Sequence, residues 1–330
     1  MSRNEALELI ERDRNETDPH GQATREAFHL ADVFVRTANA EYQQQLTRFL
    51  DLLFGYPFHT PTQEEHGMFI AFAAALRSAD LSRQVGSAVV SAGGEIVGAG
   101  CNDVPKAGGG LYGPEGKDQR DYVRGEDTNE IRRNELIREI VSVLFPKNTA
   151  KRRLNQAIRR LKNTGIMDLT EYGRATHAEM DALLAAARVG VSVRGATLYT
   201  TTFPCHNCTR HIIGAGIRRV VYIEPYPKSR AEELHSDAIT ITEQEQNPTA
   251  NDDGDRVSFD SFVGVGPRRY TDLFAITLSS GKKIVRKENG RRITWTPNGA
   301  RPRVPMLPSS YLEREEVASN ELERAMRNKK

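Results

Sequence analysis

The chain has 330 residues, of which 38% are hydrophobic and 27% are charged. This composition is typical of a folded globular protein of about two domains, and it excludes disordered and collagen-like chains. Lys and Arg (46) nearly balance Asp and Glu (44), so the chain also lacks the strong overall positive charge of a dedicated nucleic-acid-binding protein.

Residues 1–58 contain two helical stretches and are predicted to form an N-terminal helical segment. Charged residues recur from Met1 to Glu16, which therefore lack the apolar core of a secretory signal. The longest unbroken apolar run, Met68 to Leu76, is far shorter than the ~20 residues that span a bilayer. We therefore expect a cytoplasmic protein.

The best organised region covers residues 59–230. It begins with a T-x-x-E capping box at Thr62 and Glu65, followed by apolar residues at helical spacing. Two short apolar runs, Gln84–Val90 and Glu95–Cys101, then flank an Ala-Gly-Gly sequence, which is typical of a β-hairpin.

Four further elements follow in alternation: a helix at Thr176–Arg188, a strand at Ala196–Thr202, a helix at Cys208–Ile213 and a strand at Arg219–Ile223. A strand, a helical crossover and a second strand imply a parallel, right-handed pair with helices on both faces of the sheet. The predicted fold class is therefore α/β, with a three-layer α/β/α sandwich.

A long insertion, residues 104–173, interrupts this pattern. It contains a Gly-rich loop at Ala107–Gly116, a helix capped by Asp127 and Glu130, and a second helix near Ala150–Leu161. Insertions of this length commonly form lids or interfaces. The stretch from Lys147 to Lys162 is basic without any acidic residue, which suits either a solvated helix face or an anion site for nucleotide phosphates or RNA.

Residues 231–330 are predicted to be a linker and a C-terminal appendage. Glu243 to Asp255 is acidic and rich in Asn, as linkers are. Strand-like pieces follow around Ser258–Val265 and Ile293–Thr296, and then a helix whose N-terminal cap is Ser310 with Glu313.

Three cysteines are too few for a disulfide framework, and Cys205 and Cys208 form a C-x-x-C pair that indicates metal or redox chemistry. His177 begins another helix, so one imidazole and two thiolates are available at helix starts, a donor set suited to Zn²⁺. A catalytic zinc keeps its fourth position for water and lowers the pKa of that water to about 7. A redox dithiol in a thioredoxin-like fold would explain neither His177 nor Glu179.

The pair H-A-E (177–179) and P-C-x-x-C (204–208) resembles the signature of the zinc-dependent nucleobase and nucleotide deaminases. The resemblance to deoxycytidylate deaminases extends over Arg83–Val90, Gly100–Asn102, Thr201–Cys208 and Ile212–Tyr222. Asp181 stands where those enzymes commonly have Asn. The resemblance implies a cytidine-deaminase-like sandwich.

The insertion and the tail, at Val104–Tyr112 and Phe262–Arg269, resemble bacterial anti-phage dCTP deaminases. Those proteins usually carry a P-loop kinase-like domain in front. This sequence contains no G-x-x-x-x-G-K-[ST], but Leu9–Val35 is similar to the end of such a domain. Residues 1–58 are accordingly interpreted as its remnant.

The resemblance implies one catalytic zinc per chain, bound by His177, Cys205 and Cys208, with Glu179 as the catalytic proton carrier. The expected reaction is deamination of dCTP or dCMP to the deoxyuridine nucleotide and ammonia, serving nucleotide depletion against phage. The expected substrate-binding residues are Asn102, Ala178, Thr202, Tyr226, Lys228 and Lys106. Of these, Asn102 has the alternative of closing a turn, while Lys106 and Lys228 are candidates for binding phosphate.

Alternatives to this function are a housekeeping dCMP deaminase of pyrimidine metabolism, a cytosine or adenine deaminase that edits nucleic acids, and a binding protein with a degenerate site. The near-neutral charge and the deoxycytidylate-like strands favour free nucleotides over a nucleic acid. Expected partners are a small-molecule deoxycytidine nucleotide, further copies of the chain in a homo-oligomer, and a regulatory nucleotide or RNA. No membrane partner is expected.

Overall fold

The computed structural model describes residues 27–38, 41–144, 151–161, 164–242, 256–278, 283–300 and 302–304, together with residues 9, 315–316, 318–320, 322 and 326. The chain forms two compact units. The first comprises Met1–Ala31 and Gln63–Val263, and the second comprises Asp32–Thr62 and Gly264–Lys330. No helix among the described residues combines the length and the apolar character that a bilayer crossing requires.

The first unit is built on a six-stranded mixed sheet with the strand order β3-β2-β4-β5-β7-β6. The predicted hairpin is present, and β2 pairs antiparallel with both β3 and β4. The remaining pairs are parallel, which confirms the parallel crossover predicted for the last two strands of the motif. The strands are β2 (Gly86–Val90), β3 (Ile96–Cys101), β4 (Thr197–Thr202), β5 (Arg219–Glu224), β6 (Ile239–Ile241) and β7 (Val257–Ser261).

Strand register shows that helices cover both faces of this sheet. A Cβ added at Gly86 would meet Ala71 and Ala75 of α4 (Gln63–Ala75), whereas one added at Gly100 would meet α8 (Ala178–Arg188). Gly100 pairs with Ser87, the neighbour of Gly86, and successive strand residues face opposite sides of a sheet. Helices α4 and α8 therefore lie on opposite faces, and the predicted three-layer α/β/α sandwich is confirmed.

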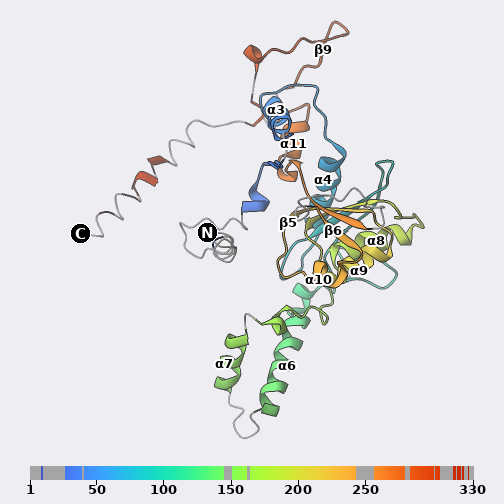
Figure 1. Ribbon diagram of the computed structural model, residues 1–330, viewed down its shortest axis with the longest axis vertical. Helices are drawn as coiled ribbons and strands as arrows, with labels where there is room; N and C mark the ends of the chain where they lie inside the picture. Colours follow the sequence, from blue (N-terminus) through green and yellow to red (C-terminus); the bar gives the residue numbers. More distant parts are fainter. Residues whose placement is uncertain are drawn as a thin grey trace. The chain divides into compact units, whose positions relative to one another are not determined.

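The face that carries α8 also carries α9 (His206–Gly214), since buried residues of both helices share one apolar core with the sheet. Figure 1 shows α8, α9 and the short α10 (Ala231–His235) gathered together and α4 apart from them. On the α4 face, Arg219 of β5 contacts Glu64 at 2.6 Å and also pairs with Asp260 of β7. This ion-pair network ties α4 to two neighbouring strands.

The sheet continues beyond residue 230, where the sequence suggested the end of the deaminase domain. Strands β6 and β7 extend it in parallel, so the compact unit reaches Val263. The strand-like piece predicted at Ser258–Val265 divides into β7 and β8 (Gly264–Val265), which belong to different units. The predicted linker, Glu243–Asp255, lies outside the described residues.

The insertion contains α5 (Asp121–Arg124), α6 (Thr128–Leu144), α7 (Lys151–Leu161) and a 3-10 turn, η2 (Gly165–Asp168). The predicted cap of α6 is present, since the Asp127 carboxylate accepts a hydrogen bond from the Glu130 backbone N–H at 2.9 Å. Helices α6 and α7 pack side by side as a hairpin (Figure 1). Its apolar side includes the half-buried Ile158 and Leu161 of α7.

The second unit joins two segments that the sequence assigned to opposite ends of the molecule. Strand β1 (Val33–Phe34) pairs with β8, and Leu52 of α3 (Tyr42–Leu53) shares a small apolar core with Val265 and with Leu273 of α11 (Tyr270–Phe274). N-terminal residues thus complete the C-terminal fold. The predicted cap at Ser310 and Glu313 lies outside the described residues.

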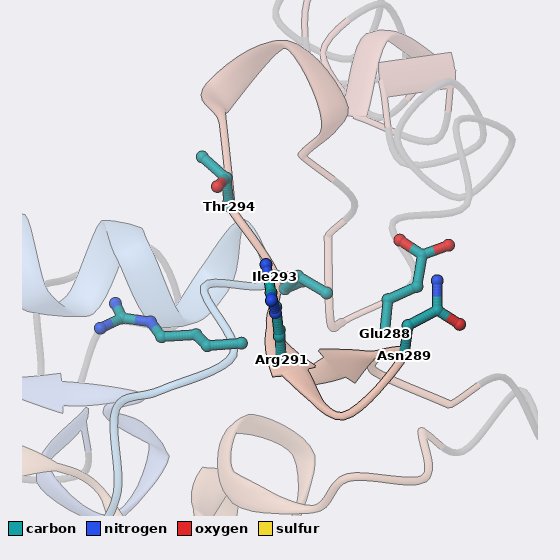
Figure 2. Close-up of a pocket in the computed structure, with 6 residues that line it drawn as sticks. Glu288, Asn289, Arg291, Ile293 and Thr294 are labelled. Carbon is teal, nitrogen blue, oxygen red and sulfur yellow. The ribbon is translucent and has the colours of Figure 1, made fainter.

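A short hairpin, β9 (Lys287–Glu288) and β10 (Arg291–Arg292), turns at Asn289-Gly290, both of which have positive φ. Asn-Gly favours such turns because both residues tolerate this backbone conformation. Figure 2 shows that an open hollow at this hairpin is lined by charged and polar side chains around Ile293. None of the described residues that line this hollow is His177, Cys205 or Cys208. The second unit further comprises two 3-10 turns, η3 (Pro267–Arg269) and η4 (Pro297–Gly299), while the first unit also contains η1 (Phe28–Leu30).

Candidate metal centre and catalytic cavity

Three metal-ligand candidates meet where two helices begin. His177 is the N-terminal cap residue of α8, Cys205 is the cap of α9, and Cys208 lies in the first turn of α9. The His177 Nδ1 atom is 3.4 Å from the Cys205 sulfur and 3.3 Å from the Cys208 sulfur. The two segments are far apart in sequence, and the parallel strand–helix topology brings their helix N-termini together.

The donor set fits a zinc ion. Bond lengths of about 2.3 Å to sulfur and 2.0–2.1 Å to nitrogen in a tetrahedron imply S···N separations of roughly 3.5 Å. The two observed separations are close to this value, and the three ligand atoms all lie within 4.8 Å of one another. Three protein ligands are also the number found in catalytic zinc sites, which keep one position open.

The electrostatics of the centre favour thiolate on one sulfur. Hydrogen bonds from Cys208 and from His177 lower the pKa of Cys205 to about 4, despite its burial. The same contact with Cys205 raises the pKa of His177 to about 9, while the bond to Cys205 together with burial raises that of Cys208. Metal binding requires deprotonated sulfur, so the centre holds one such ligand in advance.

Glu179 lies beside these donors without belonging to the three-ligand group. Its side chain is only 4% exposed, and its Oε2 atom is 3.3 Å from the Cys208 sulfur. Burial is the main cause that raises the pKa of this carboxyl group. On an ideal helix, residues 177 and 179 would point in different directions, but His177 precedes the helix as its cap. The helix therefore meets the centre end-on, as the sequence predicted.

A cavity of about 700 Å³ opens in front of the centre. One wall contains His177, Glu179 and Cys205, and Cys208 is buried behind it. The cavity also brings together the predicted substrate residues other than Lys106, namely Asn102, Ala178, Thr202, Tyr226 and Lys228. Its volume is within the range of ~300–1,000 Å³ typical of small-molecule sites.

Several of these residues already have protein partners. The Asn102 side chain accepts a hydrogen bond from the Val85 N–H at 2.7 Å and donates one to the Arg83 carbonyl at 2.8 Å. It therefore closes the loop before β2, as its alternative interpretation held, and it does so at the cavity surface. The Tyr226 ring lies under the Arg83 guanidinium at 5.6 Å.

Lys106 lines a different cavity of about 420 Å³, together with Asp181 and Arg188. The loop that carries Lys106 is closed by a bridge between Pro105 and Leu111. Asp181 accepts a hydrogen bond from the Cys101 N–H at 3.4 Å and so joins α8 to β3. The structure thus separates Lys106 from the other substrate candidates, contrary to the expectation that it lies beside them.

One whole wall of the metal-site cavity was missed by sequence reasoning. It comes from the insertion and includes Asn129 and Arg133 of α6, Met167 of η2 and Arg174. The i, i+4 spacing of Asn129 and Arg133 places them on one helix face. The sequence offered no signal for which face of α6 turns toward the metal centre.

The family described as the cytidine and deoxycytidylate deaminase zinc-binding region matches residues 61–224. A deoxycytidylate deaminase of Enterobacteria phage T2 is 48% identical over 54 residues, which are 16% of this chain and 29% of that protein. The chain thus spans less than a third of that relative. A deoxycytidylate deaminase of Mycobacterium phage D29 is 30% identical over 165 residues, 49% of this chain and 94% of that protein.

Among solved structures, dCMP deaminase from the cyanophage S-TIM5, in complex with dCMP and dUMP, is 20% identical. The match covers 55% of this chain and 94% of that chain, with a TM-score of 0.33.

Proposed function

The chain belongs to the cytidine and deoxycytidylate deaminase zinc-binding family, and on that premise we propose that it deaminates deoxycytidine nucleotides, dCMP or dCTP. The products are the deoxyuridine nucleotide and ammonia. The observation that carries the proposal is the placement of a buried carboxyl group, Glu179, beside a three-donor zinc centre at the wall of one cavity.

His177, Cys205 and Cys208 hold the zinc ion in this proposal. When bound, zinc polarises water and lowers its pKa to about 7, which supplies a nucleophile at neutral pH. Around this centre the chain places Cys208 and Glu179, which are both almost fully buried.

Glu179 moves the proton in the reaction. Its carboxylate accepts the proton that water loses as the water oxygen bonds to C4 of cytosine. The protonated carboxyl then donates to N3. Glu179 next takes the remaining proton from the hydroxyl group on C4 and donates it to the amino nitrogen, so that the C4–N4 bond breaks and the C4 carbonyl forms. One water is consumed and one ammonia is released. The raised pKa of Glu179 suits a group that must both take and give a proton near neutral pH.

The shape of the cavity supports a free nucleotide as the substrate. The insertion contributes a wall with Asn129, Arg133 and Met167, opposite residues of the zinc-binding helices. A deaminase that acts on nucleic acid needs an open groove with stacking aromatic residues for the flanking bases. Among the described residues that line this cavity, Tyr226 and Phe203 are the only Phe, Tyr or Trp side chains.

The proposal extends to the biological role. Depletion of dCTP during phage infection is favoured by the resemblance of residues 104–112 and 262–269 to anti-phage dCTP deaminases. A housekeeping dCMP deaminase would leave cellular dCTP in place. Measuring dCTP in infected cells that express the wild type or Glu179→Gln separates these roles, because only catalytic depletion depends on Glu179.

The biochemical test incubates the purified protein with deoxycytidine, dCMP, dCTP, CTP and a cytosine-containing oligonucleotide and quantifies uracil products. We expect dCMP or dCTP to be the best substrate. Glu179→Gln should retain zinc and the thermal midpoint but lose at least the ~10²-fold of rate typical of an acid–base group. Glu135→Gln, which alters an exposed carboxylate on α6, is the matched control. Preferential deamination of the oligonucleotide, or near-normal turnover by Glu179→Gln, would refute the proposal.

A further inference from the structure

The insertion wall of the cavity is held together by side chains of α6. The Asn129 amide donates to the Leu169 carbonyl at 2.8 Å and accepts from the Tyr172 N–H at 3.3 Å. One turn later, the Arg133 Nη1 atom donates to the Met167 carbonyl at 3.3 Å. These bonds join α6 to the segment that returns to His177, so the wall is attached directly to the zinc-binding helix.

Arg133 differs from the other arginines that line the cavity. Each of the others forms an ion pair with a carboxylate: Arg83 with Glu224, Arg174 with Asp121 and Arg230 with Glu233. In the described part of the chain, no carboxylate forms an ion pair with Arg133. Its Nε atom is buried and has no hydrogen-bond partner. A guanidinium in this state lacks the anion that normally compensates a partly buried charge.

Three of the carboxylates that line the cavity accept hydrogen bonds from nearby backbone N–H groups. Asp80 accepts from the N–H groups of Ser82 and Arg83, Asp127 accepts from that of Glu130, and Glu171 accepts from that of Thr170. Each therefore stabilises its own loop or helix start. The guanidinium of Arg133 remains open to an anion that enters the cavity from solvent.

We propose that Arg133 determines substrate specificity by binding the phosphate group of the nucleotide whose cytosine is placed at Glu179. The inference rests on the proposed function and goes beyond it, since it names the group that separates nucleotides from nucleosides. A planar guanidinium binds phosphate oxygens through two parallel hydrogen bonds, which a lysine cannot reproduce. The terminal Nη groups of Arg133, one of which also donates to the Met167 carbonyl, are the donors for the phosphate.

The test compares deamination of dCMP, dCTP and deoxycytidine by the wild type and by Arg133→Ala. A lost charge-assisted contact of this kind should lower kcat/KM for the nucleotides by about 10- to 100-fold. The kcat/KM for deoxycytidine should change by less than about twofold, because base and sugar contacts are unaffected. Arg133→Lys should recover part of the loss, because it keeps the charge without the paired donors.

Arg132→Ala is the matched control. Arg132 is the exposed neighbour of Arg133 on α6, forms an ion pair with Glu135 at 2.9 Å and does not line the cavity. Its removal should leave all three substrates unchanged. Inorganic phosphate provides a second readout: as a competitive inhibitor of dCMP deamination, it should be weaker against Arg133→Ala than against Arg132→Ala.

The outcomes separate failure of the Arg133–phosphate contact from failure of the proposed deaminase function. If the wild type deaminates nucleotides and Arg133→Ala loses nucleotide and nucleoside activity equally, Arg133 only supports the Met167 segment and the inference is overturned. If the wild type deaminates none of the substrates, the proposed function fails, and calorimetric binding of dCMP then decides on Arg133 alone. Weaker dCMP binding by Arg133→Ala would still support a phosphate contact, and equal binding would overturn it.

Discussion

Substituting Gly100 by Ala should damage both the fold and the metal centre, although Gly100 does not line the metal-site cavity. Gly100 lies on β3 where α8 crosses closely. An added Cβ would be 2.4 Å from the Ala182 nitrogen and 2.7 Å from the Ala178 oxygen. Both are backbone atoms of α8, so no side-chain rotation can relieve the overlap.

The required displacement follows from these distances. Ordinary van der Waals contact begins at 3.4 Å, so α8 must move away from β3 by about 1 Å. Overpacking of this kind typically costs about 1–3 kcal/mol of unfolding free energy. The displaced turn carries Glu179, and a misplacement of ~1 Å can lower catalytic rate by ~10²-fold.

The measurements are urea unfolding, zinc content and kcat/KM for dCMP. Gly214→Ala is the control, since Gly214 ends α9 with no heavy atom within 4 Å of an added Cβ. That variant should keep wild-type activity and gain at most ~1 kcal/mol of stability from helix propensity. If Gly100→Ala retained the stability of the wild type within about 0.5 kcal/mol and also its activity, the close approach of β3 and α8 would not position Glu179 as argued.

Two further predictions concern the centre and the core. Cys208→Ala should reduce zinc from one ion per chain to none by elemental analysis and abolish activity; two zinc ions per wild-type chain would contradict the single site. Burial raises the pKa of Tyr199 to about 12. The folded state therefore keeps the phenol proton after the unfolded chain has lost it, and the unfolding free energy should fall by about 2 kcal/mol as the pH rises from 10 to 12. Tyr199→Phe should flatten this fall in urea titrations, and an unchanged slope would argue against it.

Local sequence determined the elements and the chemistry of the centre. Capping residues and apolar periodicity located α4, α6, α8 and the β2–β3 hairpin, because these signals act over one or two turns of chain. The residue types at 177, 205 and 208 indicated zinc, because few other ions suit one imidazole with two thiolates. The strand–helix–strand order also implied that their helix N-termini would meet.

Tertiary structure alone decided which distant segments pair. Strand β7 joins the central sheet beside β5, and Val33 of the N-terminal segment pairs with Val265 of the tail. The residues of a short strand do not indicate which other strand it will pair with. Strand register is set by burial of one face against elements that are far away in sequence. The predicted domain boundary at residue 230 was placed by the order of elements along the chain. It therefore could not take account of these two strand pairings.

Tertiary packing also decided which cation of the insertion lines the metal-site cavity. Lys106 and Arg133 are both cations of the insertion, and composition does not distinguish them. The bridge from Pro105 to Leu111 holds the Lys106 loop beside another cavity, whereas hydrogen bonds to Leu169 and Met167 turn one face of α6 toward the zinc centre. The sequence by itself determined which metal-binding and acidic groups this protein has. The packing of the insertion decided that Arg133 lines the same cavity as these groups and that Lys106 lines another, because a helix face is selected by what it is bonded to in three dimensions.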